Sequence, residues 1–167
     1  RQHWQGVMPD SDDPNHDTVR NHCLWGSLMA GGAGVEWYFG YRHAHNDLGL
    51  EDFRSRELWW KQSTLATRFM NQYPLEEMSS RDELVDIAGA YCLAKEGELY
   101  LAYLPAGATP AKLQLKHSAP LNVAWYNPRE GGELKQGSVR SLEGAGAKSL
   151  GLPPSDPELD WVVVVER

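Results

Sequence analysis

The chain has 167 residues, with 16 basic and 23 acidic side chains and a formal net charge of −7. This charge balance excludes a nonspecific nucleic-acid binder, because such proteins carry a basic face. The longest purely aliphatic run, Val162–Val165, is far shorter than the roughly 20 residues that cross a bilayer, so no membrane span is expected. Two cysteines, Cys23 and Cys92, are too few for a disulfide framework, and we expect each to be a buried apolar thiol.

The first half of the chain is predicted to alternate helix, strand and helix. A helix is expected from Thr18, with Asp17 as its cap, because that carboxylate can accept the free N–H groups of the first turn. The β-branched and aromatic run Val35–Phe39 favours a strand. Helical spacing of apolar residues predicts a second helix over Glu51–Tyr73, which Pro74 ends. This order is a piece of an alternating α/β fold with too few strands to close a sheet.

The second half is predicted to be antiparallel β-structure. After Pro74 the helical spacing disappears, and short apolar runs alternate with turn residues such as those of 127–132 and 153–154. Regular recurrence of short strands is typical of a sandwich or barrel. The expected strands are Tyr91–Ala94, Leu99–Leu104, Lys112–Leu115, Leu121–Tyr126, a pair around Leu134 and Val139, Ser149–Leu152 and Trp161–Val165.

Three segments are candidate ligand sites, and a plainer explanation is favoured for each. Asp10–Asp17 contains four carboxylates that could wrap a calcium ion, but a solvated loop with a helix cap explains it better. His43, His45 and Asp47 match zinc or manganese ligands in type, although a two-histidine motif is weak and a polar loop lining a cleft is preferred. Gly31–Gly34 lies between helix and strand, which reverses the order that a phosphate loop needs. We therefore expect neither a metal nor a cofactor.

The aromatic strand is the candidate element for binding a substrate. On a strand, Glu36 and Tyr38 share one face, and Trp37 and Phe39 share the other. A carboxylate beside aromatic rings suits a sugar-binding cleft, since rings stack on the apolar face of a pyranose and acids bind its hydroxyls. The alternative is that one face is core and Glu36 is simply paired, and the residues alone do not separate the two. No Ser/His/Asp or Cys/His catalytic order is present.

Three longer stretches resemble a known family. Leu24–Tyr41, with the sequence LWGSLMAGGAGVEWYFGY, resembles the last barrel segments of the apiosidase-like (β/α)8 glycoside hydrolases. Trp125–Gly132 (WYNPREGG) and Asp160–Val165 (DWVVVV) resemble the C-terminal β-sandwich of the same proteins. That module carries the family label "putative collagen-binding domain of a collagenase". The resemblance runs from about Asp17 to the end of the chain.

The resemblance implies a fold that is α+β overall. Residues 1–78 would be the terminal helix–strand–helix piece of a (β/α)8 barrel, and residues 79–167 an antiparallel β-sandwich. The parent would be a secreted or periplasmic glycoside hydrolase, although no signal peptide is read in these residues. Both catalytic acids would precede Arg1, and this chain alone would be inactive. Because the carboxyl ends of barrel strands form the active-site face, the following residues would line the substrate cleft: Glu36, Tyr38, Tyr41, Arg42, His43, His45 and Asp47.

The expected partner is the carbohydrate substrate of the parent protein, and the sandwich is expected to dock on the barrel. The main alternative is a complete, non-catalytic module that binds polysaccharide or collagen through aromatic side chains such as Trp125 or Tyr126. Both rings are equally compatible with a place in the sandwich core. A third possibility is that the sandwich braces the barrel and binds nothing.

Overall fold

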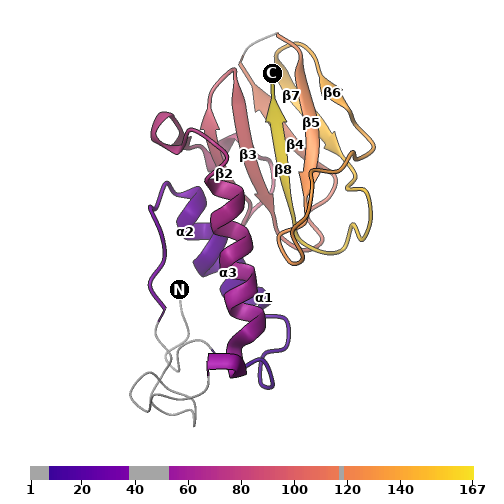
Figure 1. Cartoon of the computed structure of the whole chain (residues 1–167). Coiled ribbons are helices and arrows are strands. Elements are labelled where there is room, and N and C mark those ends of the chain that lie inside the picture. Colours follow the sequence, from indigo (N-terminus) through magenta and orange to yellow (C-terminus); the bar gives the residue numbers. More distant parts are fainter. Residues whose placement is uncertain (1–7, 38–52, 117–118) are drawn as a thin grey trace. The chain divides into compact units, whose positions relative to one another are not determined.

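The computed structural model describes residues 8–37, 53–116 and 119–167 (Figure 1). The chain divides into two compact units. The first unit is Arg1–Leu28 with Gly32–Gln72, and the second unit is Met29–Gly31 with Tyr73–Arg167. The sequence prediction places the domain boundary after residue 78, whereas this division falls between Gln72 and Tyr73. No described helix has the length and apolar character that crossing a membrane requires.

The first unit is helical in its described part. Its first helical stretch is continuous and consists of α1 (Asp17–Val19), a π-helical segment (Arg20–Trp25) and α2 (Gly26–Met29), of which Met29 is grouped with the second unit. Helix α3 (Glu57–Met70) follows a short 3₁₀ turn, Phe53–Arg56. The prediction of two helices is therefore confirmed, although α3 begins and ends inside the predicted range.

The ends of these helices correct the sequence prediction. The capping residue of the first helix is His16, in a left-handed conformation with φ 53°, and not Asp17. Asp17 lies in the first turn, where its carboxylate accepts a hydrogen bond from the Arg20 guanidinium at 2.5 Å. Helix α3 begins where the Asp10 carboxylate accepts the Leu58 N–H at 2.9 Å. A cap supplied from so far along the chain cannot be read from residues near the helix.

The predicted strand Val35–Phe39 is not formed in its described part. Val35, Glu36 and Trp37 carry no strand assignment, and the remaining residues lie outside the described ranges. A barrel strand is held by hydrogen bonds to neighbouring strands, and the described residues pair none with this segment. The assignment of the first unit to a barrel stays a prediction.

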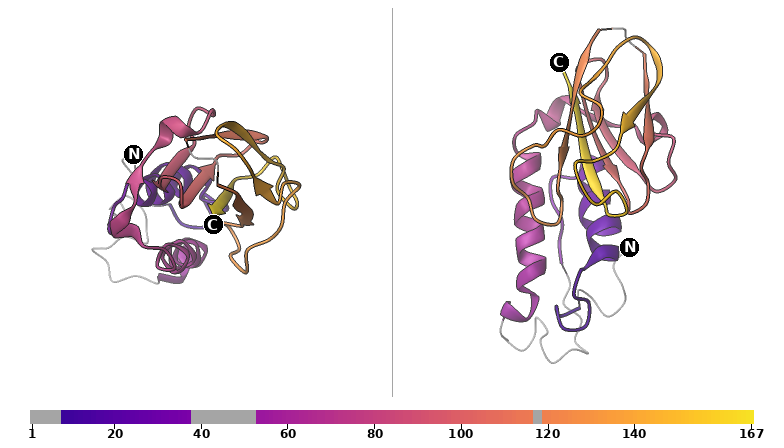
Figure 2. Two further views of the ribbon diagram at one scale, coloured as in Figure 1. Left: turned by 90° about the horizontal axis from the view of Figure 1, so that it is seen from above. Right: turned by 90° about the vertical axis from the view of Figure 1, so that its right-hand side faces the viewer.

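The described residues of the second unit form two antiparallel sheets. The larger has six strands in the order β1-β2-β3-β8-β5-β6, and the smaller pairs β4 with β7. The two sheets face each other (Figure 2). Their bounds are β1 (Ser79–Ser80), β2 (Tyr91–Lys95), β3 (Leu99–Leu104), β4 (Ala111–Leu115), β5 (Leu121–Tyr126), β6 (Ser141–Leu142), β7 (Gly146–Gly151) and β8 (Trp161–Glu166). The chain is α+β overall, and the predicted antiparallel sandwich is present.

The core of the second unit lies between the two sheets and follows the two-residue period of strands. Alternate residues of β3 and β8, among them Tyr100, Ala102, Val163 and Val165, join Leu113 of β4 in one buried cluster. The sequence predicted most of these strands because turn residues bound them closely.

The predicted strand pair around Leu134 and Val139 is wrong. Of this stretch, Lys135 alone forms a bridge, with Trp125, and the next strand is β6. At Gly137 an added Cβ would lie 2.4 Å from Trp125 Nε1 and 2.5 Å from the carbonyl oxygen of Leu152. The backbone at Gly137 therefore lies close against the Trp125 indole, and this long-range contact is the physical difference from a regular strand.

Candidate functional site

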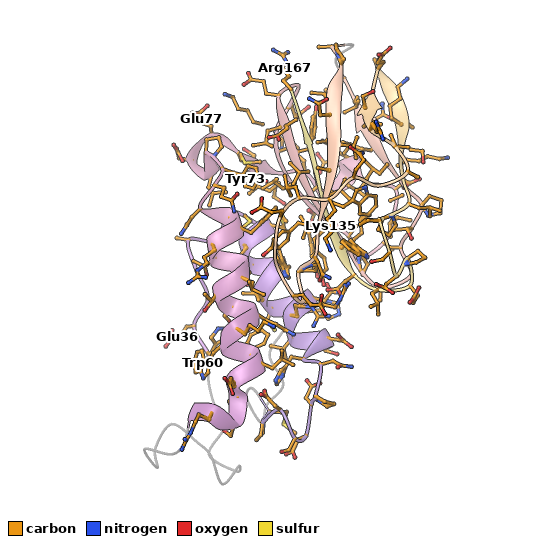
Figure 3. The ribbon with its side chains drawn as sticks, turned by 45° about the vertical axis from the view of Figure 1, so that its right-hand side comes forward. Glu36, Trp60, Tyr73, Glu77, Lys135 and Arg167 are labelled. Carbon is orange, nitrogen blue, oxygen red and sulfur yellow. The ribbon has the colours of Figure 1, made fainter. Side chains whose placement is uncertain are left out.

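Glu36 is the one predicted cleft residue that falls in the described part of the chain. It is an exposed side chain of the first unit (Figure 3). The others lie outside the described residues: Tyr38, Tyr41, Arg42, His43, His45 and Asp47.

Glu36 lines a pocket of about 310 Å³ in the first unit, which we call the Glu36 pocket. This volume lies at the lower end of the roughly 300–1,000 Å³ typical of small-ligand sites. One wall comes from the π-helical segment, a rare element that often marks functional sites. The lining residues are His22, Cys23, Ser27, Gly34, Val35, Glu36 and Trp37. The pocket therefore combines a carboxylate, an imidazole, a thiol, a hydroxyl and an indole.

The Glu36 pocket is lined by several polar and ionisable side chains. No group of three or more His, Cys, Asp or Glu side chains within the described ranges is arranged to hold a metal ion. Cys23 is only half-buried, so the predicted burial of this thiol is wrong, whereas Cys92 is fully buried as predicted. Burial raises the pKa of the Cys92 thiol to about 12. Sequence spacing could not find this pocket, because His22 and Cys23 meet Glu36 only through the fold.

A series of ring contacts supports the Trp37 wall of the pocket. The Trp37 and Trp59 rings meet edge-to-face, with centroids 4.4 Å apart and an interplanar angle of 83°. Trp59 also contacts His16, whose ring centroid is 5.5 Å away. Trp59 and His16 are both completely buried.

The acidic segment Asp10–Asp17 hydrogen-bonds to the start of α3, and we call these contacts the Asp10 clasp. One Asp10 oxygen lies 2.7 Å from His16 Nε2, and the other accepts the Leu58 N–H that begins α3. The Asp13 carboxylate accepts the backbone N–H of His16 at 3.1 Å. These contacts engage Asp10 and Asp13 within the chain, and the cap that the segment provides is Asp10 on α3, not Asp17 on the first helix as predicted.

In the second unit the WYNPREGG and DW motifs come together as an internal polar cluster. Arg129 Nη1 donates to Asp160 Oδ1 at 2.8 Å and to the Asp160 carbonyl. The Tyr103 hydroxyl donates to the other Asp160 oxygen at 2.5 Å, and the Arg129 guanidinium lies 5.3 Å from the centre of the Trp161 ring. Asn127 Oδ1 accepts the backbone N–H of Arg129 at 3.0 Å. The motifs tie the loop after β5 to the start of β8.

Trp125 lies in the sandwich core and cannot provide the aromatic binding surface that the module alternative invoked. Trp125 is 0% exposed and Tyr126 is 5% exposed, and Trp125 packs edge-to-face on Trp161 with centroids 6.3 Å apart. Within the described part of the second unit, no aromatic side chain is exposed. Its large exposed apolar side chains are Leu134, Leu152 and Leu159.

Comparison with known proteins identifies a family for most of the second unit. A family model described as "Putative collagen-binding domain of a collagenase" matches residues 83–166, which span most of the second unit. No curated protein matches the chain.

Solved structures of similar fold cover both units. One is named "Glycoside hydrolase": it is 15% identical, with a TM-score of 0.61, over 90% of this chain and 36% of that chain. Another is a glycoside hydrolase family 5 protein from Bacteroides vulgatus ATCC 8482, 17% identical with a TM-score of 0.63, over 89% of this chain and 35% of that one. At such identities the similarity shows the fold alone. The chain spans about a third of the length of these proteins.

Proposed function

The chain belongs to the family described as "Putative collagen-binding domain of a collagenase", and from this premise we propose that it is the C-terminal part of a glycoside hydrolase-like protein acting on glycans. Residues 1–78 would be the last unit of its (β/α)8 barrel, and residues 79–167 its accessory β-sandwich. The observation that carries the proposal is coverage. The similarity to solved glycoside hydrolases extends over 90% of this chain but only 36% of the first of those proteins.

The catalytic acids of the parent would lie upstream of Arg1. Glycoside hydrolysis uses a pair of carboxyl groups on either side of the scissile bond, and the Glu36 pocket offers a single one among its described lining residues. Glu36 would line the substrate cleft, together with Tyr38, Tyr41, Arg42, His43, His45 and Asp47. We further propose that the parent is secreted or periplasmic, an expectation that rests on the family resemblance.

The sandwich would dock on the barrel through the outer face of its larger sheet. On that face, opposite the core between the sheets, the central strands carry Leu93, Leu101, Tyr103, Val162 and Val164. An antiparallel sheet whose second face meets water carries polar residues there. Because this outer face is apolar, it supports the proposal that the sandwich packs on the barrel and stabilises it.

Activity assays of the 167-residue chain test the proposal. On aryl glycosides and pectic side chains we expect no turnover above that of a matched Glu36→Gln variant. Turnover by the chain that Glu36→Gln abolishes, and that a Glu143→Gln control in the second unit leaves intact, would contradict it. Such a result would mean that the chain carries its own catalytic carboxylate.

The family match favours a second candidate function, a non-catalytic module that binds collagen or polysaccharide. With Trp125 in the sandwich core, its binding surface would use exposed apolar side chains such as Leu152 and Leu159. Retention of the full chain on fibrillar collagen or insoluble polysaccharide, lost in a Leu152→Ser, Leu159→Ser variant but kept in a Glu158→Ser control, would favour this function. The main proposal predicts no retention.

A further inference from the structure

The wall of the Glu36 pocket is connected to a buried histidine by two ring contacts, neither of which is a parallel stack. Trp37 lines the pocket and meets Trp59 edge-to-face at 4.4 Å, and Trp59 meets His16 at 5.5 Å with an interplanar angle of 59°. The Nε1 atom of Trp59 is buried without a hydrogen-bond partner. Because a hydrogen bond does not fix the indole, its position depends on the rings that pack against it.

His16 is held far more firmly than Trp59. Its side chain is fully buried, and its backbone adopts a left-handed conformation with φ 53°. The ring Nε2 lies 2.7 Å from Asp10 Oδ1, and the backbone N–H donates to Asp13. Both the ring and the backbone of His16 are therefore fixed by partners outside its own helix.

The same Asp10 fixes the backbone next to Trp59. Its second oxygen accepts the Leu58 N–H, and its own N–H donates to the Ser55 carbonyl at 2.8 Å. Asp10 thus holds the residue before Trp59 and the ring that packs on Trp59. Both contacts restrict where the Trp59 indole can lie.

We propose that His16 is a positioning residue for the pocket wall formed by Glu36 and Trp37, and that it acts through Trp59. His16 does not line the pocket, so it touches no ligand there. Its ring limits the movement of Trp59, which in turn sets the plane of the Trp37 indole beside Glu36. This inference rests on the proposed function only for the identity of the ligand, which would be a carbohydrate.

The test uses the full 167-residue chain labelled with 5-fluorotryptophan and the variant His16→Asn. Asparagine tolerates a positive φ, so the backbone is kept while the ring is lost. We expect the fluorine resonance of Trp37, assigned with Trp37→Phe, to move toward the position of free fluorotryptophan. Cys23 lines the same pocket, and its alkylation rate should rise about two- to tenfold, the factor that corresponds to a lost aromatic contact.

Two further variants make the test specific. In a Trp59→Leu background, His16→Asn should change neither the Trp37 resonance nor the Cys23 rate further, because the connection is already broken. Ser11→Ala is the matched control, since Ser11 is exposed in the same segment and bonds to the neighbouring Asp12. An unchanged Trp37 resonance in His16→Asn, or an equal effect of His16→Asn in both backgrounds, would overturn the proposal.

Trp25, which packs on Phe69, reports whether the first unit stays folded. If its resonance also moves in His16→Asn, Asp10→Asn decides the matter, because its amide oxygen can still accept the Leu58 N–H while the bond to His16 is weakened. Movement of Trp37 with a stationary Trp25 then supports the proposal, and either a stationary Trp37 or movement of both rings contradicts it. Neither readout involves carbohydrate, so failure of the positioning role and failure of the proposed function give different results.

Discussion

The two units of this protein differ in how fully they satisfy their own buried polar atoms. Among the described residues of the first unit, buried side-chain atoms that no other described residue hydrogen-bonds include His16 Nδ1, Asn21 Oδ1, Trp59 Nε1, Gln62 Oε1 and Ser63 Oγ. Within the described part of the second unit, Trp125 Nε1 alone is in this state. Buried polar groups in folded proteins are nearly always bonded, so the described contacts leave the first unit with more unsatisfied buried polar atoms than the second.

The largest expected difference between the two units is in the alkylation of their cysteines. At pH 8 we expect iodoacetamide to modify Cys23, which lines the Glu36 pocket, and to leave Cys92 unmodified. Burial raises the pKa of the Cys92 thiol from 9.0 to about 12, which lowers its thiolate fraction at this pH about 1,000-fold. Burial also keeps the reagent away from the sulfur atom. Mass spectrometry of peptic fragments measures both sites, with Cys23→Ser as the control. Equal labelling would mean that the second unit opens as easily as the first.

The next largest effect is expected on the stability of the second unit when a core side chain is removed. Trp161 is fully buried and packs on Trp125 beneath the Arg129 guanidinium. Trp161→Ala should lower the free energy of unfolding of this unit by about 3–5 kcal/mol. The matched variant is Leu159→Ala, an exposed site nearby at which a loss below about 1 kcal/mol is expected. Urea unfolding measured by circular dichroism tests both, and similar losses in the two variants would argue against this core.

Much of the second unit could be predicted from sequence, because local signals define it. Leu99–Leu104 and Leu121–Tyr126 match β3 and β5 at both ends, since turn residues stand directly beside alternating or apolar runs. The error around Leu134 and Val139 has a non-local cause, the close contact of the Gly137 backbone with Trp125. No local pattern contains that contact.

The first unit was less predictable because its contacts join distant segments. Asp10 begins α3 at Leu58, and His16 and Trp37 both pack on Trp59. Of the candidate site, sequence reasoning found Glu36 through its aromatic neighbours. The π-helical wall with His22 and Cys23 depends on helix geometry and has no sequence signal of its own.

Removing the contacts of the Asp10 clasp should lower the stability of the first unit by a smaller amount. Asp10→Ala removes both the cap of α3 and the partner of His16, and should destabilise the first unit by about 1–2 kcal/mol. Amide hydrogen exchange should show faster exchange along α3 and no change in β3 and β8. Ser11→Ala should exchange like the parent chain. Unchanged exchange in α3 would show that the Asp10 contacts contribute nothing to the first unit.

The smallest effect concerns acid stability at the β2–β3 turn of the second unit. Hydrogen bonds from Lys116 and Arg81 lower the pKa of the Glu96 carboxyl below its ordinary 4.5. A lowered pKa adds stability above the unfolded pKa, and that stability is lost as pH falls below about 4.5. Glu96→Gln should therefore flatten the pH dependence of unfolding in this acid range, with Glu143→Gln as control. An unaltered slope would show that the ion pairs are fully screened.

The gene sequence upstream of the codon for Arg1 tests the central claim most directly. If the chain is the C-terminal part of a glycoside hydrolase-like protein, the reading frame continues upstream into the rest of a (β/α)8 barrel. That barrel should carry two carboxylates at the ends of its strands. A start codon and an export signal immediately before Arg1 would contradict this account.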